Sequence, residues 1–151
     1  MCHMAQFDAG SWLDLGGFAR LSAFICHATG GRCEDWDPWV GSNSVMLHRS
    51  LDNNLYDGPP TVRVYRRVPI TLGPSPEPTD GPRAPVDQLN GRPTWLQGNA
   101  TPAGTMGRPM RMVAQLSTEI VKFDITPTGV AYLFFDDDSA KGNARLLWQG
   151  Q

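Results

Sequence analysis

The stretch Met110-Arg-Met-Val-Ala-Gln-Leu116 opens a series of apolar runs that decides the fold. The series continues with Val121-Lys-Phe-Asp-Ile125, Gly129-Val-Ala-Tyr-Leu-Phe-Phe135 and Arg145-Leu-Leu-Trp-Gln149. Short runs that are rich in β-branched and aromatic side chains and separated by turn residues are typical of β-strands. The sequence therefore predicts a succession of strands in the carboxy-terminal part of the chain.

Alternation along these runs predicts which side chains share a face of the sheet. In the first run, alternation places Met112, Ala114 and Leu116 on an apolar face. The opposite, mixed face carries Arg111, Val113 and Gln115. Residues 121–125 alternate in the same way and should turn their apolar side chains inward.

The last two runs predict a β-hairpin. Residues 129–135 offer water no polar side chain apart from Tyr132, which suits a central strand covered on both faces. The polar residues 136–143 form a turn, and 145–149 make the returning strand. The register of this hairpin should bury Leu146 and Trp148 on one face.

The order of these motifs resembles the YwqG-like family of bacterial proteins over residues 89–149. The matching elements are Gly91, Pro93, Trp95-Leu96-Gln97-Gly98, Gln115-Leu116, Gly129-Val130, Tyr132, Phe134 and Leu147-Trp148-Gln149. A weaker likeness extends to residues 62–67 and Pro69. The chain departs from the family at residues 123–129, where a longer connection with a proline replaces a Phe-Gly-Asp-x-Gly loop. The resemblance implies a bacterial, cytosolic protein; relatives of this kind are sometimes encoded near secreted-toxin systems.

Composition limits the classes of function. A chain of 151 residues with 40% hydrophobic and 19% charged residues fits one globular domain, 1–151. The net charge of −2 argues against a nucleic-acid binder that works by neutralising phosphates. No apolar run approaches the length of a membrane span, and no secretion-signal pattern is present. Three cysteines are too few for a disulfide framework, so we expect a cytoplasmic protein.

Elsewhere the chain predicts a mainly β architecture, an antiparallel sheet or sandwich with long Pro/Gly-rich loops. Residues 61–68 and 45–47 are predicted to be strands. Residues 18–26 have near-helical spacing, and a strand at 21–26 fits nearly as well, so this run is ambiguous. A helix there would make the fold α+β. The proline-rich residues 69–85 predict a surface loop; docking into the aromatic groove of a partner is the alternative.

Metal binding and catalysis have little support in the sequence. Cys26, His27, Cys33 and His48 do not follow a zinc-site spacing, and buried thiols explain the cysteines better. Pairing of Cys26 with Cys33 stays open. No nucleophile elbow or phosphate-binding glycine loop occurs. We therefore expect no catalytic residue, metal or cofactor.

Two acidic segments are candidate partner-binding surfaces. The first consists of Glu34, Asp35, Trp36, Asp37 and Trp39, and the second of Asp136, Asp137 and Asp138. Carboxylates beside aromatic rings on a loop suit a cationic partner surface. The alternatives are that the tryptophans fill the core and that the three aspartates mark a solvated hairpin tip.

A third candidate is a set of glutamines and tryptophans on the predicted strands, namely Trp95, Gln97, Gln115, Trp148 and Gln149. They could line a shallow ligand pocket, with the indoles as walls and the amides as polar contacts. Alternatively, the amides bond to backbone groups and hold strand ends together.

These observations favour a non-catalytic protein that binds another protein, in concrete form an immunity protein that blocks the active site of a toxin. A small-ligand-binding domain or a weak enzyme using the Trp/Gln pocket is the alternative. A structural protein of a phage or secretion apparatus is a third possibility.

Overall fold

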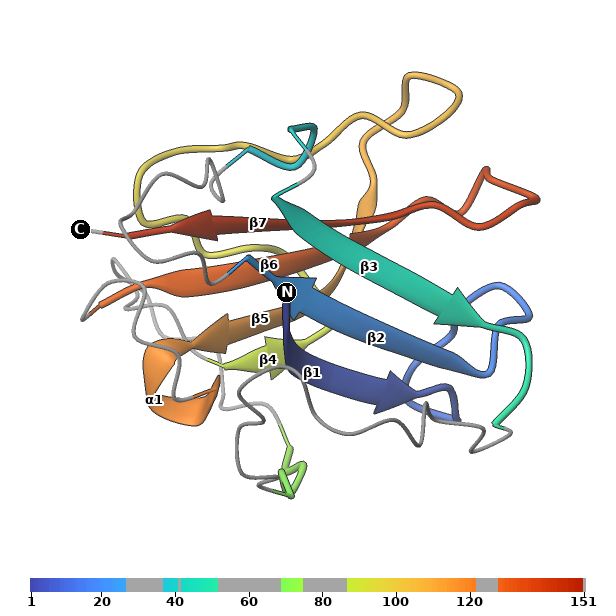
Figure 1. The fold of residues 1–151 in the computed structure, drawn as a ribbon, viewed down its shortest axis with the longest axis horizontal. Helices are drawn as coiled ribbons and strands as arrows, with labels where there is room; N and C mark the ends of the chain where they lie inside the picture. Colours follow the sequence, from blue (N-terminus) through green and yellow to red (C-terminus); the bar gives the residue numbers. More distant parts are fainter. Residues whose placement is uncertain (27–36, 41, 52–68, 75–86, 122–127, 151) are drawn as a thin grey trace.

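In the computed structural model, which describes residues 1–26, 37–40, 42–51, 69–74, 87–121 and 128–150, the chain forms two antiparallel sheets (Figure 1). The first sheet has the order β1 (Cys2–Asp8), β2 (Arg20–Ile25) and β3 (Asn43–His48). The second has the order β4 (Gln88–Leu89), β5 (Arg111–Ser117), β6 (Val130–Phe135) and β7 (Ala144–Gln149). The described helix is one turn, α1 (Thr118–Val121). The prediction of a mainly β, antiparallel fold is confirmed.

The two sheets pack face to face around one core. Phe7, Leu21 and Ile25 of the first sheet meet Leu133 and Trp148 of the second in a single buried cluster. Figure 1 shows the β1–β3 layer in front of the β4–β7 layer, with β3 next to β7. The far face of the second sheet is also apolar and is covered by the chain that follows β4. A β-sandwich of this kind leaves its loops at the two ends of the strands.

The hairpin of β6 and β7 agrees with the sequence prediction. All six residues of β6 are buried, as expected of a strand covered on both faces. The strands pair from Val130↔Gln149 to Phe135↔Ala144. Leu146 and Trp148 point into the core between the sheets, and Leu147 points to the far face.

A β-bulge in β5 corrects the predicted faces of residues 110–116. Met112 pairs with Phe134 and Ala114 with Leu133, so Val113 is an extra residue between them. Val113 and Ala114 both lie in the core between the sheets, whereas Met112 lies on the far face. The prediction that Met112 shares a face with Ala114 and Leu116 is wrong, and so is the grouping of Val113 with Gln115, which lies on the far face. Val113 and Arg111 do share a face, since Arg111 lies over Phe135. The prediction failed because it assumed strict alternation, which has no place for the extra residue of a bulge.

The amino-terminal sheet resolves the ambiguity over residues 18–26 in favour of a strand, β2. The short strand predicted at 45–47 is the centre of β3. Strand β1 was not expected, because a register shift between His3 and Ala5 interrupts its alternation. From Ala5 onward the alternation is regular, with Phe7 buried and Gln6 and Asp8 exposed.

Three further predictions concern segments that are helical or lie outside the described residues. The strand predicted at 121–125 is wrong at Val121, which ends α1; residues 122–127 lie outside the described residues. The strand predicted at 61–68 also lies outside them, as does most of the proline-rich segment. Its first part, 69–74, belongs to no helix or strand and is exposed.

Candidate functional site

Residues 93–98, here called the strap, cross the far face of the second sheet and are held there by glutamine side chains. Gln115 Oε1 accepts a hydrogen bond from the Thr94 N–H at 2.8 Å. Gln149 Oε1 accepts from the N–H groups of Leu96 and Gln97, both at 3.1 Å, and its Nε2 donates to the Gly98 carbonyl at 2.9 Å. The amides therefore supply the partners that a neighbouring strand would otherwise give to this backbone.

Aromatic stacking completes the attachment of the strap. The Trp95 ring stacks on Tyr132, with centroids 4.6 Å apart, and on Phe134, with centroids 6.0 Å apart. The Tyr132 hydroxyl donates to the Thr94 carbonyl at 2.8 Å. Burial raises the pKa of Tyr132, which keeps its hydroxyl protonated as a donor.

Four of the five residues predicted to line a ligand pocket gather at the strap, but Trp148 does not. It lies in the core between the sheets, on the opposite side of β7 from Gln149, since neighbouring residues of a strand point to opposite faces. The indoles of Trp95 and Trp148 therefore do not face a common space. The amides of Gln115 and Gln149 bond to the backbone of the strap, as the alternative reading of the glutamines expected.

The three aspartates of the 136–143 turn have three different environments. Asp136 is 2% exposed and is not at a solvated tip. Burial alone would raise the pKa of Asp136, but hydrogen bonds from Thr105, Asn143 and the Asp138 N–H outweigh it and lower the pKa to about 2. Asp137 is exposed and Asp138 partly exposed. Of this acidic segment, only Asp137 and Asp138 are accessible to a partner.

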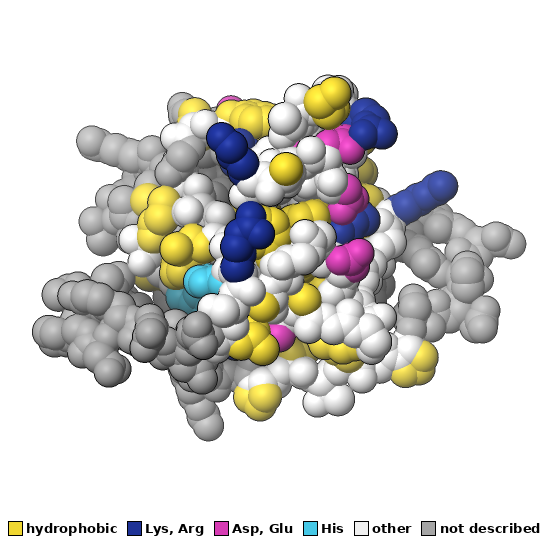
Figure 2. Space-filling model, turned by 90° about the vertical axis from the view of Figure 1, so that its right-hand side faces the viewer, with side chains coloured by type: hydrophobic (Ala, Val, Ile, Leu, Met, Phe, Trp, Pro, Cys, Tyr) yellow, Lys and Arg dark blue, Asp and Glu magenta, His cyan; other side chains and the backbone are white. Residues whose placement is uncertain are grey.

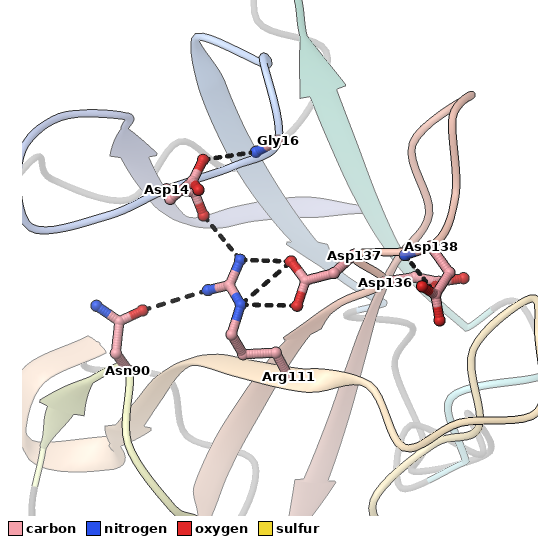
Figure 3. Close-up of polar contacts among 7 residues, drawn as sticks. All are labelled: Asp14, Gly16, Asn90, Arg111, Asp136, Asp137 and Asp138. Carbon is pink, nitrogen blue, oxygen red and sulfur yellow. Dashed lines mark hydrogen bonds and ion pairs between the residues drawn. The ribbon is translucent and has the colours of Figure 1, made fainter.

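Asp137 and Asp138 are each paired with an arginine. Arg108 forms an ion pair with Asp138. Arg111 contacts both oxygens of Asp137, and its Nη2 also donates to the Asp14 carbonyl at 2.8 Å (Figure 3). In the same figure Arg111 Nη1 reaches the side chain of Asn90, at 3.5 Å. Arg111 thus connects the loop after β1, the end of β4 and the 136–143 turn.

At this end of the sandwich positive and negative side chains lie next to each other. Figure 2 shows dark blue and magenta side chains side by side over the loops, with no continuous field of one sign. The expected acidic surface at residues 136–138 is largely neutralised by the protein's own arginines.

The other acidic segment places an indole in solvent. Trp39 is 57% exposed and Val40 is 47% exposed. Asp37 Oδ1 accepts a hydrogen bond from the Trp39 N–H at 2.7 Å, which fixes a tight turn. The alternative in which Trp39 fills the core is wrong. Glu34, Asp35 and Trp36 lie outside the described residues.

Sequence reasoning missed the partner of Trp39. The Arg145 guanidinium lies 4.7 Å from the centroid of its ring. Arg145 is the charged residue of β7, whose other residues are Gln149 and four apolar ones, and a charge in such a strand is a signal of a special role. The two residues are far apart in sequence, so only the adjacency of β3 and β7 brings them together.

Sequence reasoning also missed a polar cluster on the outer face of the first sheet. His48 Nε2 lies 3.1 Å from Ser22 Oγ, and Ser22 Oγ lies 3.5 Å from Gln6 Oε1. A hydroxyl beside an imidazole resembles the first pair of a nucleophilic triad. Among the described residues, however, no carboxylate orients the imidazole of His48, and Ser22 is buried. The cluster bonds three neighbouring strands together.

The described part of the chain holds no group of three or more His, Cys, Asp and Glu side chains that could bind a metal ion. Cys26 is partly buried there, and His27 and Cys33 lie outside it. Within the same residues, no helix has the length and apolar character needed to cross a bilayer.

Comparison of this chain with family models, curated proteins and solved structures finds no match. The site is therefore interpreted from its own geometry.

Proposed function

We propose that this chain is a non-catalytic protein-binding domain of the YwqG-like kind, working in the bacterial cytoplasm. The observation that carries the proposal is the exposure of Trp39 and Val40 on the loop that leads into β3. An exposed tryptophan beside an arginine is the composition of an interface hot spot. Cys2 is a buried free thiol, which is compatible with a reducing compartment.

The other candidate groups support this choice because their polar atoms are used within the protein. Gln115 and Gln149 bond to the strap. Asp136 is buried and hydrogen-bonded, and arginines pair with Asp137 and Asp138. The ligand-binding alternative loses Trp148 as a wall, so the surface around Trp39 is the better candidate.

The concrete form of the proposal is an immunity protein that covers the active site of a toxin. Asp37 would face a basic residue of the toxin, and Trp39 would anchor the contact. Inhibition of this type is steric and electrostatic, with no chemistry by the inhibitor.

Co-expression with the products of neighbouring genes tests the proposal. We expect one product to be toxic alone, to be tolerated with this chain and to co-purify with it. Trp39→Ala should weaken the complex by tenfold or more, on the order of a hot-spot loss. Met106→Ala is the matched control, because Met106 is 69% exposed on a different loop. If no product co-purifies, or if both variants behave alike, the proposal is wrong.

A further inference from the structure

The contact between Trp39 and Arg145 joins the adjacent edges of the two sheets. Trp39 precedes β3 and Arg145 belongs to β7, and these strands run side by side (Figure 1). Stacking of the guanidinium on the indole limits its rotation and leaves its charge unchanged. A guanidinium that is already oriented loses less freedom when it binds an anion.

Arg145 has no counter-ion among the described residues. Its Nη1 donates to the Ala144 carbonyl at 3.3 Å, and its buried Nε has no hydrogen-bond acceptor. Ion pairs are formed instead by three other arginines of the described ranges, Arg20, Arg108 and Arg111. A partly buried cation that none of these residues neutralises is poorly solvated, so it gains more than an exposed one when an anion arrives.

We infer that Trp39, Val40 and Arg145 bind an acidic side chain of the partner protein. The carboxylate pairs with Arg145, and an apolar side chain next to it packs on Trp39 and Val40. This inference rests on the proposed function and specifies what the protein-binding surface recognises. Guanidinium and carboxylate match in geometry, and paired hydrogen bonds to charged groups are the strong ones.

A single-stranded nucleic acid could also use a tryptophan and an arginine, by stacking a base on the ring. The surface does not favour it, because the Asp37 carboxylate lies on the same loop and the whole chain has a net charge of −2. Binding of a phosphate backbone needs a track of several cations. Binding of an acidic side chain of a protein needs only one cation.

Selection from a display library of random short peptides tests the inference without a known partner. The peptides that the wild-type chain enriches should carry Asp or Glu next to an apolar residue. For these peptides, Arg145→Met should raise the Kd about tenfold or more, and Arg145→Lys should raise it less. Replacing the acidic residue of the peptide by its amide should cause the same loss, with little further loss in Arg145→Met.

The matched control is Arg49→Met. Arg49 also lies 4.7 Å from an aromatic ring, that of Phe18, but it follows the opposite end of β3. Arg49→Met should leave peptide binding unchanged. Thermal unfolding of each variant checks that the fold is intact, and the peptide-amide comparison holds even if Arg145→Met unfolds.

The inference is overturned if no peptides are enriched, if the enriched peptides lack acidic residues, or if wild type and Arg145→Met bind equally. Tighter binding of an oligothymidylate than of the peptides would also overturn it. If a natural partner co-purifies and depends on Trp39 but not on Arg145, this inference fails and the proposed function stands. If acidic peptides bind but no gene product does, the immunity proposal fails alone.

Discussion

Thr105 donates both its backbone N–H and its hydroxyl to one oxygen of Asp136, each at 2.6 Å. The two residues lie on loops that are distant in sequence, so the carboxylate fastens the 103–109 loop to the 136–143 turn. Asp136→Asn puts an amide where these donors need an acceptor. We expect it to lower the free energy of unfolding by about 2 kcal/mol, measured by urea denaturation at neutral pH. Asp137→Asn, at the exposed neighbour, is the control and should cost less.

The same carboxylate makes stability depend on pH in the acid range. The pKa of Asp136 is about 2 in the folded protein, below its ordinary value of 3.8. The stabilisation is therefore fully present above about pH 4 and is lost as the pH falls toward 2. Melting temperatures measured across this range should fall more steeply for the wild type than for Asp136→Asn. The lowered pKa of Asp8, hydrogen-bonded to Arg20, contributes in the same direction in both proteins. Parallel curves would show that Asp136 does not titrate as described.

Gln149 should contribute more to stability than Gln97, although both belong to the strap contacts. Gln149→Leu leaves the Leu96 and Gln97 N–H groups without an acceptor, at a cost of about 2–3 kcal/mol. Gln97 is exposed, and among the described residues its side chain donates to the Gly150 carbonyl alone. Gln97→Ala should cost below about 1 kcal/mol. Denaturant unfolding compares the two, and equal costs would mean that the strap is not held as described.

Gly129 has no room for a side chain. A Cβ built on it would lie 2.2 Å from Cζ2 of Trp148, whose ring is packed in the core. Gly129→Ala should therefore lower the free energy of unfolding by about 1–3 kcal/mol, as overpacking does. Gly73, which has no atom of the described residues beyond its chain neighbours within 4 Å of its Cβ position, is the matched control. Gly73→Ala should be neutral or slightly stabilising by thermal unfolding.

Arg111 should contribute more than its ion pair alone. A double-mutant cycle of Arg111→Ala and Asp137→Ala isolates the pair, for which we expect about 1 kcal/mol or less because Asp137 is exposed. Arg111→Ala alone should cost more than Asp137→Ala, since Arg111 also donates to the Asp14 carbonyl. The coupling measured by denaturation should shrink in high salt. A coupling that salt does not change would contradict a surface ion pair.

The sequence was sufficient for the elements whose pattern is local. The apolar run of β6 and the turn after it predicted the hairpin and the inward position of Leu146 and Trp148. The sequence was insufficient where the backbone departs from regular alternation. The extra residue at Val113 and the register shift in β1 change the facing of side chains without changing composition.

The candidate site was predicted in part, for the same reason. The sequence singled out the glutamines, but which face of the sheet each indole occupies depends on register, and this separates Trp148 from Trp95. It also singled out Trp39, but the Arg145 guanidinium over its ring follows from the packing of β3 against β7. The burial of Asp136 depends on Thr105, a contact between distant loops that no local pattern reveals.

The bulge at Val113 sets a limit on how the gene for this chain can diverge. A codon lost at that point would restore a regular ladder and rotate half of β5, so that side chains under the strap and side chains between the sheets would exchange places. Length variation among descendants should therefore accumulate in connections such as residues 69–74, and the spacing from Met112 to Leu116 should stay fixed while its side chains change.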